Sequence, residues 1–218
     1  MMSADGRFEV KPLRPGDEED LAMLHLRAMG EYFLSSLGRG FLRRFYAEFC
    51  RHPFDYGVVA RRSDSGRPVA FVVGTSDARA HFRAFYRRHG LYVAGSVLAG
   101  VLFHSEARRG VLRRLGHMRL AVGSILGLGG SAAPATARGP RVVCPVRLLS
   151  IAVDPEARGS GVASLSSEHF EAQVRRAGFS RVGLSVHADN DRAISFYRKT
   201  GWNEVYRSAA GLWFEKEI

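Results

Sequence analysis

An apolar run, a glycine-rich turn and an amphipathic helix follow one another in the last third of this 218-residue chain. The run Val146–Val153 has the nearly continuous apolar character of a strand in a sheet that is buried on both faces. The turn Arg158-Gly159-Ser160-Gly161 comes next, and residues 162–177 then place apolar side chains at helical spacing. This order of elements predicts an α/β fold with a mixed sheet.

The other predicted elements fit the same class of fold. Alternating or apolar runs predict strands over residues 7–13, 56–61, 68–74, 181–187, 202–206 and 212–217, with the second and third forming a hairpin. Capping signals and helical spacing predict helices that begin after Asp17 and over residues 40–49, 81–89, 95–127 and 191–200.

The glycine-rich turn has a chemical meaning of its own. Glycines between a strand and a helix let backbone N–H groups converge without interference from Cβ atoms. The helix N-terminus behind them carries about half a positive charge, so the turn suits a pyrophosphate. No Lys-Ser/Thr pair follows, as a Walker A loop requires, and the third glycine of a dinucleotide fingerprint is missing. Taken alone, the turn also fits an ordinary connection between a strand and a helix.

The positive charge of the chain is concentrated in one segment. Residues 79–147 contain 12 arginines, no lysine and one acid, Glu106, and so carry the whole net charge of +11. Such a segment suits an anionic partner, namely a phosphate-bearing small molecule, a nucleic acid or a membrane surface, or it is a solvated basic face. Helices packed on the domain are favoured over a helix that lies on a membrane, and no nucleic-acid partner is expected.

Composition excludes several classes of protein. A hydrophobic content of 46% excludes an intrinsically disordered chain. The two cysteines, Cys50 and Cys144, provide neither a disulfide framework nor a metal quartet, which favours reduced thiols in a cytoplasmic protein. The N-terminus lacks the apolar region of a secretory signal, and no run of about 18 apolar residues predicts a spanning helix.

Two sequence blocks resemble the GCN5-related N-acetyltransferase (GNAT) superfamily. The segment Arg158-Gly159-Ser160-Gly161-Val162-Ala163 is similar to its acyl-CoA signature, Gln/Arg-x-x-Gly-x-Gly/Ala. A second block, which runs from Asn190 through Phe196 and Tyr197 to Gly201, matches Asn-x-x-Ala-x-x-Phe-Tyr-x-x-x-Gly-Phe, with Trp202 in place of the last Phe. The resemblance covers roughly residues 146–206, and the N-terminal part fits more loosely.

The resemblance implies a single GNAT-like acyltransferase domain over residues 1–218. Its mixed, mostly antiparallel sheet would contain two splayed parallel strands and be flanked by helices, with a basic helical insertion at about residues 79–141. Acetyl-CoA would be the co-substrate, without a metal. The reaction would be direct transfer of an acetyl group to a primary amine by a cytoplasmic monomer or homodimer.

The resemblance also assigns roles to individual residues. Tyr197 would be the catalytic acid that protonates the departing thiolate, since a phenol has an ordinary pKa of about 10. Packing in the core is the alternative role for Phe196 and Tyr197. The residues that would bind acetyl-CoA are Ile151, Val153, Arg158, Gly159, Ser160, Gly161, Ala163, Ser164, Asn190 and Phe196.

The general base and the acceptor stay open. Many family members have a Glu on the strand before the signature, where this chain has Arg147. Glu31, Asp77 and His187 are candidate bases, while Arg147 could instead bind an anionic acceptor. The basic segment favours a small anionic amine, such as an amino sugar nucleotide or an amino acid derivative. A protein lysine or N-terminus is the alternative acceptor, and a catalytically degenerate acyl-CoA-binding module is the alternative to an enzyme.

Overall fold

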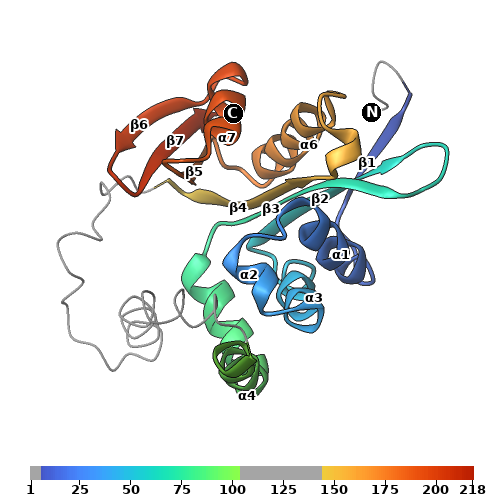
Figure 1. Ribbon diagram of the computed structural model, residues 1–218. Coiled ribbons are helices and arrows are strands. Elements are labelled where there is room, and N and C mark those ends of the chain that lie inside the picture. The colour runs from blue at the N-terminus through green and yellow to red at the C-terminus, as the bar shows by residue number, and fades with distance from the viewer. Residues whose placement is uncertain (1–5, 104–143) are drawn as a thin grey trace.

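A computed structural model describes residues 6–103 and 144–218 of the chain. These residues form a seven-stranded sheet in the order β1-β2-β3-β4-β5-β7-β6 (Figure 1). Neighbouring strands are antiparallel except for the pair β4 and β5, which is parallel. The predicted mixed, mostly antiparallel sheet is thereby confirmed. The strands are β1 (Phe8–Pro12), β2 (Asp55–Arg62), β3 (Pro68–Thr75), β4 (Val146–Val153), β5 (Arg181–His187), β6 (Asn203–Arg207) and β7 (Gly211–Glu217).

Helices cover both faces of the sheet. One face carries α1 to α4, and the other carries α6 and α7 (Figure 1). The helices are α1 (Glu18–Ala28), α2 (Phe33–Ser36), α3 (Arg39–Glu48), α4 (Ala78–Phe103), α6 (Val162–Arg176) and α7 (Asp191–Lys199). Because helices lie on both faces, the central strands have apolar side chains pointing both ways.

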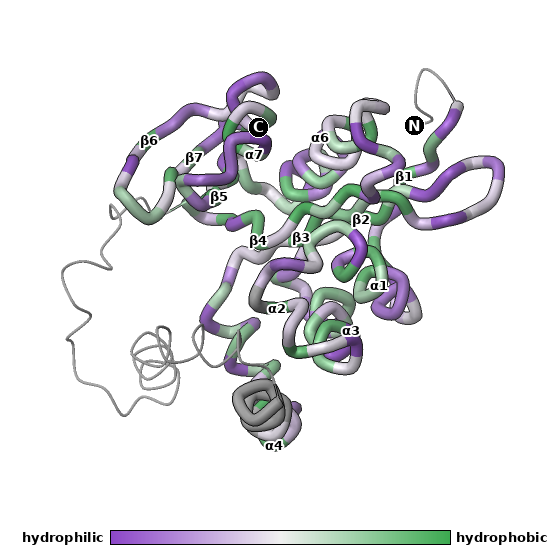
Figure 2. Tube along the Cα trace, in the orientation of Figure 1, coloured by the Kyte–Doolittle hydropathy of each residue, from purple (hydrophilic) through white to green (hydrophobic). Residues whose placement is uncertain are grey.

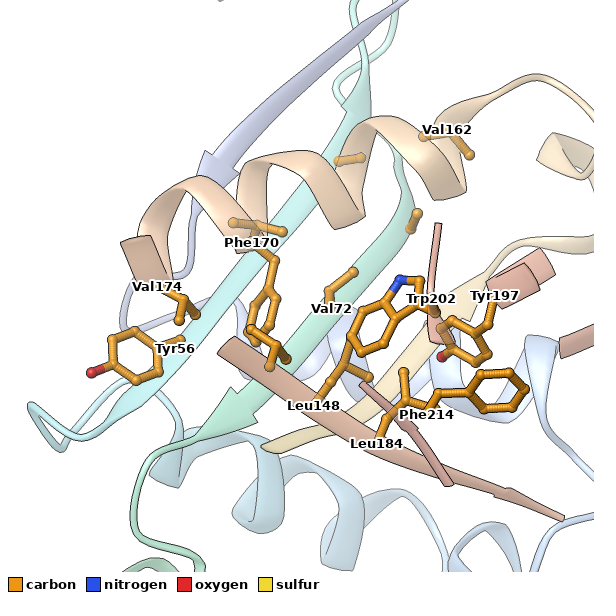
Figure 3. Packing of buried hydrophobic residues seen from close by; sticks show 14 of the residues in the cluster. Tyr56, Val72, Leu148, Val162, Phe170, Val174, Leu184, Tyr197, Trp202 and Phe214 are labelled. Atoms are coloured by element: carbon orange, nitrogen blue, oxygen red, sulfur yellow. The ribbon is translucent and has the colours of Figure 1, made fainter. Parts of the chain in front are cut away.

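Two hydrophobic cores result, one on each face of the sheet. On the side of α6 and α7, Val72 and Phe170 pack among the buried side chains shown in Figure 3. On the opposite side, Phe71 packs with Phe45 and Phe85 of α3 and α4. Figure 2 shows that the central strands are largely hydrophobic, whereas the edge strand β6 is mostly hydrophilic.

Strands β4 and β5 separate soon after they begin. Their ladder consists of two pairs, Val146 with Val182 and Arg147 with Gly183. On its other side β4 stays paired with β3 up to Val153, with an irregularity that leaves Leu149 as an extra residue. Beyond this β-bulge, no strand in residues 6–103 and 144–218 pairs with the edge of β4 that faces β5, which confirms the predicted splayed pair.

The separation also corrects one expectation about β4. We expected this strand to be buried on both faces, but its second half is only partly buried. Leu149, Ser150, Ile151 and Val153 all keep intermediate exposure. The apolar sequence therefore lines an opening rather than a closed core.

The predicted helices need one further correction. A break between helices at residues 89 and 95 is wrong, because α4 runs without interruption to Phe103. One glycine in a helix costs only about 1 kcal/mol, and Phe85 and Tyr92 hold α4 to α3 on either side of Gly90. The short helix α2 was not predicted, and the part of the predicted helix 95–127 beyond Phe103 lies outside the described residues.

A buried histidine makes the stability of this fold depend on pH. His25 on α1 is 2% exposed, and its Nδ1 lies 2.6 Å from the Tyr46 hydroxyl. Burial lowers the pKa of His25 to about 4, whereas the unfolded chain has the ordinary value near 6.5. The unfolded state therefore binds the extra proton between these two values, and the fold loses stability as the pH falls through this window.

We predict that lowering the pH from 7 to 5 costs the wild type about 2 kcal/mol of unfolding free energy through His25. His25→Asn should be less stable at pH 7, but it should not show this part of the pH dependence. Urea unfolding at both pH values measures the difference. Parallel stability–pH curves for the two proteins would contradict the assignment.

Candidate active site

A cavity of about 310 Å³ lies beside the second half of β4, where this strand has separated from β5. Its wall combines the second half of β4, the turn after it, the first part of α6, the start and middle of α7, and the residues after α1. The lining residues are Ala28, Met29, Tyr32, Ile151, Ala152, Val153, Ala157, Arg158, Gly159, Gly161, Val162, Ala163, Asn190, Arg192, Ala193, Phe196 and Tyr197. This volume and the mostly apolar wall with a few polar groups are typical of a small-molecule site.

The glycine turn at the rim has the geometry of an anion site. Gly159 and Gly161 have φ angles of +77° and +85°, which L side chains rarely adopt, and nothing lies within 4 Å of the position of a Cβ atom at either one. Leu165 is the first residue of α6 whose N–H is bonded, to the carbonyl of Gly161. The N–H groups of residues 162–164 precede it, and no side chain caps this end of α6. The helix N-terminus is therefore open to a negatively charged ligand.

Asp154 fixes the turn in place. Its carboxylate is 2% exposed, accepts hydrogen bonds from Arg27 and Arg67 at 3.1 Å each, and accepts another from the Glu156 N–H. Burial alone would raise the pKa of this carboxyl, but these three hydrogen bonds hold it below its ordinary value. Arg158 adds a bond from Nη2 to the carbonyl of Ala28, at 3.2 Å. The turn is thus tied to α1 on the opposite side of the cavity.

Asn190 joins the two sides of the cavity at another point. Its Oδ1 accepts the Ala193 N–H and caps α7, while its Nδ2 donates to the Tyr32 hydroxyl at 3.2 Å. Tyr32 comes from the connection between α1 and α2, far away in sequence. Both polar ends of the Asn190 amide therefore already have structural partners.

Tyr197 and Phe196 lie in the wall of the cavity on α7. Tyr197 is 4% exposed, and its ring contacts Trp202 and Phe214 at centroid distances of 5.4 and 5.9 Å (Figure 3). Burial raises the pKa of Tyr197 well above its ordinary value of 10.0. The phenol is consequently protonated at neutral and mildly alkaline pH. Tyr197 has both the core contacts and the access to the cavity that the sequence left as alternatives.

A second, more polar pocket adjoins the cavity. It measures about 350 Å³ and is lined by Glu31, Tyr32, His187, Asp189 and Asn190, of which Tyr32 and Asn190 also line the first cavity. Two of the three candidate bases, Glu31 and His187, therefore lie together beside the opening between the strands. The third does not, because Asp77 accepts the Ala80 N–H at the start of α4.

Three other residues from the sequence analysis lie outside the main cavity lining. The Ser160 hydroxyl donates to the Ala157 carbonyl at 2.6 Å, and Ser164 lies in the first turn of α6. Arg147 is exposed at the joined end of β4 and β5, where it lines a smaller pocket of about 60 Å³ with Glu215 and Trp213. The other nine residues assigned to acetyl-CoA or to catalysis all line the main cavity.

Among the first 35 residues, sequence reasoning named Glu31 but missed the three that line the main cavity. Ala28, Met29 and Tyr32 line the cavity from the end of α1 and the residues after it. No motif marks these positions, since they reach the site through the packing of α1 against β3 and β4. Arg192, two residues after Asn190 in the second block, was also overlooked although it adds a cation to the wall.

The cavity beside the splayed strands has an open helix N-terminus at its rim, which suits a ligand that carries an anionic group. Comparison with known proteins finds a family that this part of the chain resembles. Residues 143–202 match the sequence profile described as the acetyltransferase (GNAT) family. The match covers the part of the chain from β4 to the end of α7, which forms most of the cavity wall, and this part is similar to acyl-CoA-dependent acetyltransferases.

Several solved structures have a fold similar to that of this chain. They include a PaiA N-acetyltransferase from Thermoplasma acidophilum in complex with coenzyme A (13% identity, 97% of this chain and 99% of that chain, TM-score 0.57). The GNAT domain of PAT from S. lividans is also similar (18% identity, 98% of this chain and 93% of that chain, TM-score 0.56). A third is the ribosomal-protein-S18-alanine N-acetyltransferase from Escherichia coli (13% identity, 97% of this chain and 94% of that chain, TM-score 0.54). At these identities the likeness concerns the fold.

Because Tyr197 is buried, we predict that its phenol does not ionise in the folded protein during an alkaline titration. The chain has seven tyrosines, and Tyr197→Phe should leave the rise in phenolate absorbance between about pH 9 and 11 unchanged in the folded protein. In concentrated urea, the variant should lose one tyrosine equivalent near pH 10. If the folded variant already shows this loss near pH 10, Tyr197 is not buried as described.

Proposed function

We propose that this protein is an acetyl-CoA-dependent N-acetyltransferase that acetylates a primary amine by direct transfer. The observation that carries the proposal is the cavity between β4 and β5 with the Arg158–Gly161 turn at its rim. The residues present fit acyl-CoA, because the turn offers N–H groups and a guanidinium to a pyrophosphate and the interior is apolar enough for a pantetheine arm.

Each part of the cavity has a proposed task in binding. The N–H groups at the start of α6, together with Arg158, would hold the pyrophosphate, and the turn residues Gly159, Ser160, Gly161, Ala163 and Ser164 would shape this cradle. The unpaired edge of β4 at Ile151 and Val153 would bond the pantetheine amides. Asn190 and Phe196 would line the arm from α7.

The chain also supplies two groups for the chemistry. When bound, acetyl-CoA provides an activated acetyl thioester. A backbone N–H at the bulge of β4 would donate to the oxyanion that develops on the carbonyl, and one such donor is worth roughly 3–4 kcal/mol of transition-state stabilisation. Tyr197, which stays protonated, would give its proton to the departing sulfur.

The acceptor amine would enter through the polar pocket beside the cavity. An alkylamine arrives mostly protonated, since its pKa is near about 10.4, and it must lose a proton before attack. Glu31 or His187 would take this proton, either directly or through water. Carboxylates at Glu31 and Asp189 suit the cationic amine, both on a small molecule and at a protein N-terminus or lysine.

We expected an anionic acceptor because of the basic segment, but the arginines of α4 do not support this expectation. Arg79, Arg83 and Arg87 do not line the cavity or the adjoining polar pocket. An anionic group on the acceptor stays a prediction that would use Arg147. A thiol-release assay with acetyl-CoA and a panel of amino sugars, amino acid derivatives and peptides tests both acceptor classes, and no release with any amine would favour a binding module.

Acetyl-CoA should stabilise the folded protein through the glycine turn. At about 100 times Kd the gain is near 2.7 kcal/mol of unfolding free energy, which a thermal melt detects. Gly161→Glu should abolish this gain, because it places a side chain and a negative charge in the anion site.

Gly178→Glu is the matched control for this experiment. Gly178 follows the other end of α6, has a similar φ of +90° and also has nothing within 4 Å of a Cβ position. Both variants should lose a comparable amount of stability, roughly 1–2 kcal/mol, from backbone strain. Only Gly161→Glu should lose the response to acetyl-CoA, and an equal response in both variants would refute the assigned turn.

Tyr197→Phe should slow acetyl transfer while leaving the fold and acetyl-CoA binding largely intact, because the ring still packs on Trp202 and Phe214. We expect kcat to fall by about 10²–10⁴-fold, with a smaller effect on KM. Single-turnover rates avoid masking by slow product release. A wild-type single-turnover rate would leave Tyr197 with a packing role only.

The polar pocket supplies two candidates for the general base, Glu31 and His187. Either Glu31→Gln or His187→Gln should lower kcat by about 10²-fold or more, whichever residue takes the proton. Asp77→Asn serves as the control, since asparagine can still cap α4 and Asp77 lies outside both pockets. Near-normal rates in both pocket variants would exclude this pocket as the source of the base.

A further inference from the structure

The outer face of α4 carries a basic and apolar stripe that the acetyl-transfer site does not use. Arg79, Arg83, Arg87 and Leu91 follow one another at four-residue spacing, so their side chains share one side of the helix. All four are exposed, and Leu91 is 94% exposed, which is far more than a packed leucine would be. Among the described residues, the three arginines have no ion-pair partner.

The opposite face of α4 is firmly attached to the domain. His81 pairs with Asp55 at 2.9 Å, with both side chains fully buried, and Phe85 is 1% exposed in the core. Further along, Arg88 pairs with Glu48 at 3.0 Å, and the ring of Tyr92 lies 3.8 Å from the Arg44 guanidinium. The stripe is therefore presented by a fixed helix that extends away from the sheet beyond α3 (Figure 1).

The charge pattern along α4 has two parts. The helix contains no acidic residue from Ala78 to Phe103, and its arginines all lie in the first three turns. From Leu91 onward the helical sequence is without charge and largely apolar. A basic section followed by an exposed leucine and an uncharged section matches the layered chemistry of a bilayer interface, where anionic headgroups lie above acyl chains.

We infer that the stripe Arg79–Arg83–Arg87–Leu91 docks the protein on an anionic membrane surface. The arginines contact lipid phosphates, and Leu91 enters the boundary between headgroups and acyl chains. A nucleic acid would use the three arginines equally well, but it offers no apolar layer for Leu91. None of the helices in residues 6–103 and 144–218 has the length and apolar character to cross a bilayer.

Vesicle co-sedimentation of the full chain tests this inference. Large vesicles of phosphatidylcholine alone are compared with vesicles that contain about one third phosphatidylglycerol, at about 0.1 M salt. The wild type should partition to the anionic vesicles at least tenfold more strongly. Replacing the stripe with Arg79→Gln, Arg83→Gln and Arg87→Gln should reduce this partition on the order of 100-fold, since each charge near the surface is worth about 1 kcal/mol. Leu91→Gln alone should reduce it severalfold.

A matched triple variant controls for net charge. Arg14→Gln, Arg175→Gln and Arg176→Gln remove three exposed arginines from other parts of the surface and should leave the partition nearly unchanged. The thermal response to acetyl-CoA should persist in every variant, because none of these residues lines the cavity. Loss of that response would point to a folding defect, and its absence in the wild type would refute the proposed function without touching this inference.

Three outcomes would overturn the membrane assignment. The first is equal partition to neutral and anionic vesicles. The second is anionic partition that the stripe variant retains. The third is stronger binding to duplex DNA or RNA than to vesicles, if the triple arginine variant loses this binding and Leu91→Gln does not change it. That result would assign the stripe to a nucleic acid.

Discussion

The rest of the site depends on one feature of the sheet, the early separation of β4 from β5. Two residue pairs join these strands, and the bulge at Leu149 then turns the free edge of β4 toward an opening. Gly74 permits the bulge, since a Cβ there would lie 2.5 Å from the Arg147 carbonyl oxygen and 2.7 Å from the Phe170 ring. On the other side of the opening, Tyr197 packs on Phe214 of β7, which pairs with β5. The packing of α6 on β3 and β4, and of Tyr197 on Phe214, thus fixes the elements on either side of the opening.

The chemistry of the site follows from which groups this separation exposes. The backbone edge of β4 offers hydrogen bonds to an extended amide-containing arm, and the anion site at the start of α6 lies directly after the same strand. The ion pairs of Asp154 with Arg27 and Arg67 tie this turn to α1 and to the residue just before β3, so the anion site keeps a fixed position relative to the opening. Glu31 and His187 approach from the other elements around the cavity and give the polar pocket its character. The basic stripe of α4 belongs to a different surface.

Local sequence predicted the parts of the site that are locally encoded. The turn at Gly159 and Gly161 was predictable because its positive φ angles require glycine, and Asn190 marked the start of α7 through its capping oxygen. The bulge at Leu149 was not predictable, since no residue type encodes it and it arises from pairing with β3. Tyr32 reaches Asn190 across 158 residues, and the burial that raises the pKa of Tyr197 depends on Trp202 and Phe214 around it. The order of strands and helices along the chain was enough to predict an α/β fold with a mixed sheet. The continuity of α4 through Gly90 was not predictable, because it depends on the contacts of α4 with α3.

A crystal structure with bound coenzyme A tests the central claim most directly. If the separation of β4 and β5 forms the acyl-CoA site, the pantetheine lies between these strands and bonds the backbone of β4. The pyrophosphate then contacts the N–H groups at the start of α6, and the sulfur lies within hydrogen-bonding distance of the Tyr197 hydroxyl. Coenzyme A bound elsewhere, or a pyrophosphate distant from residues 158–164 while the gap is filled by side chains, would contradict the account.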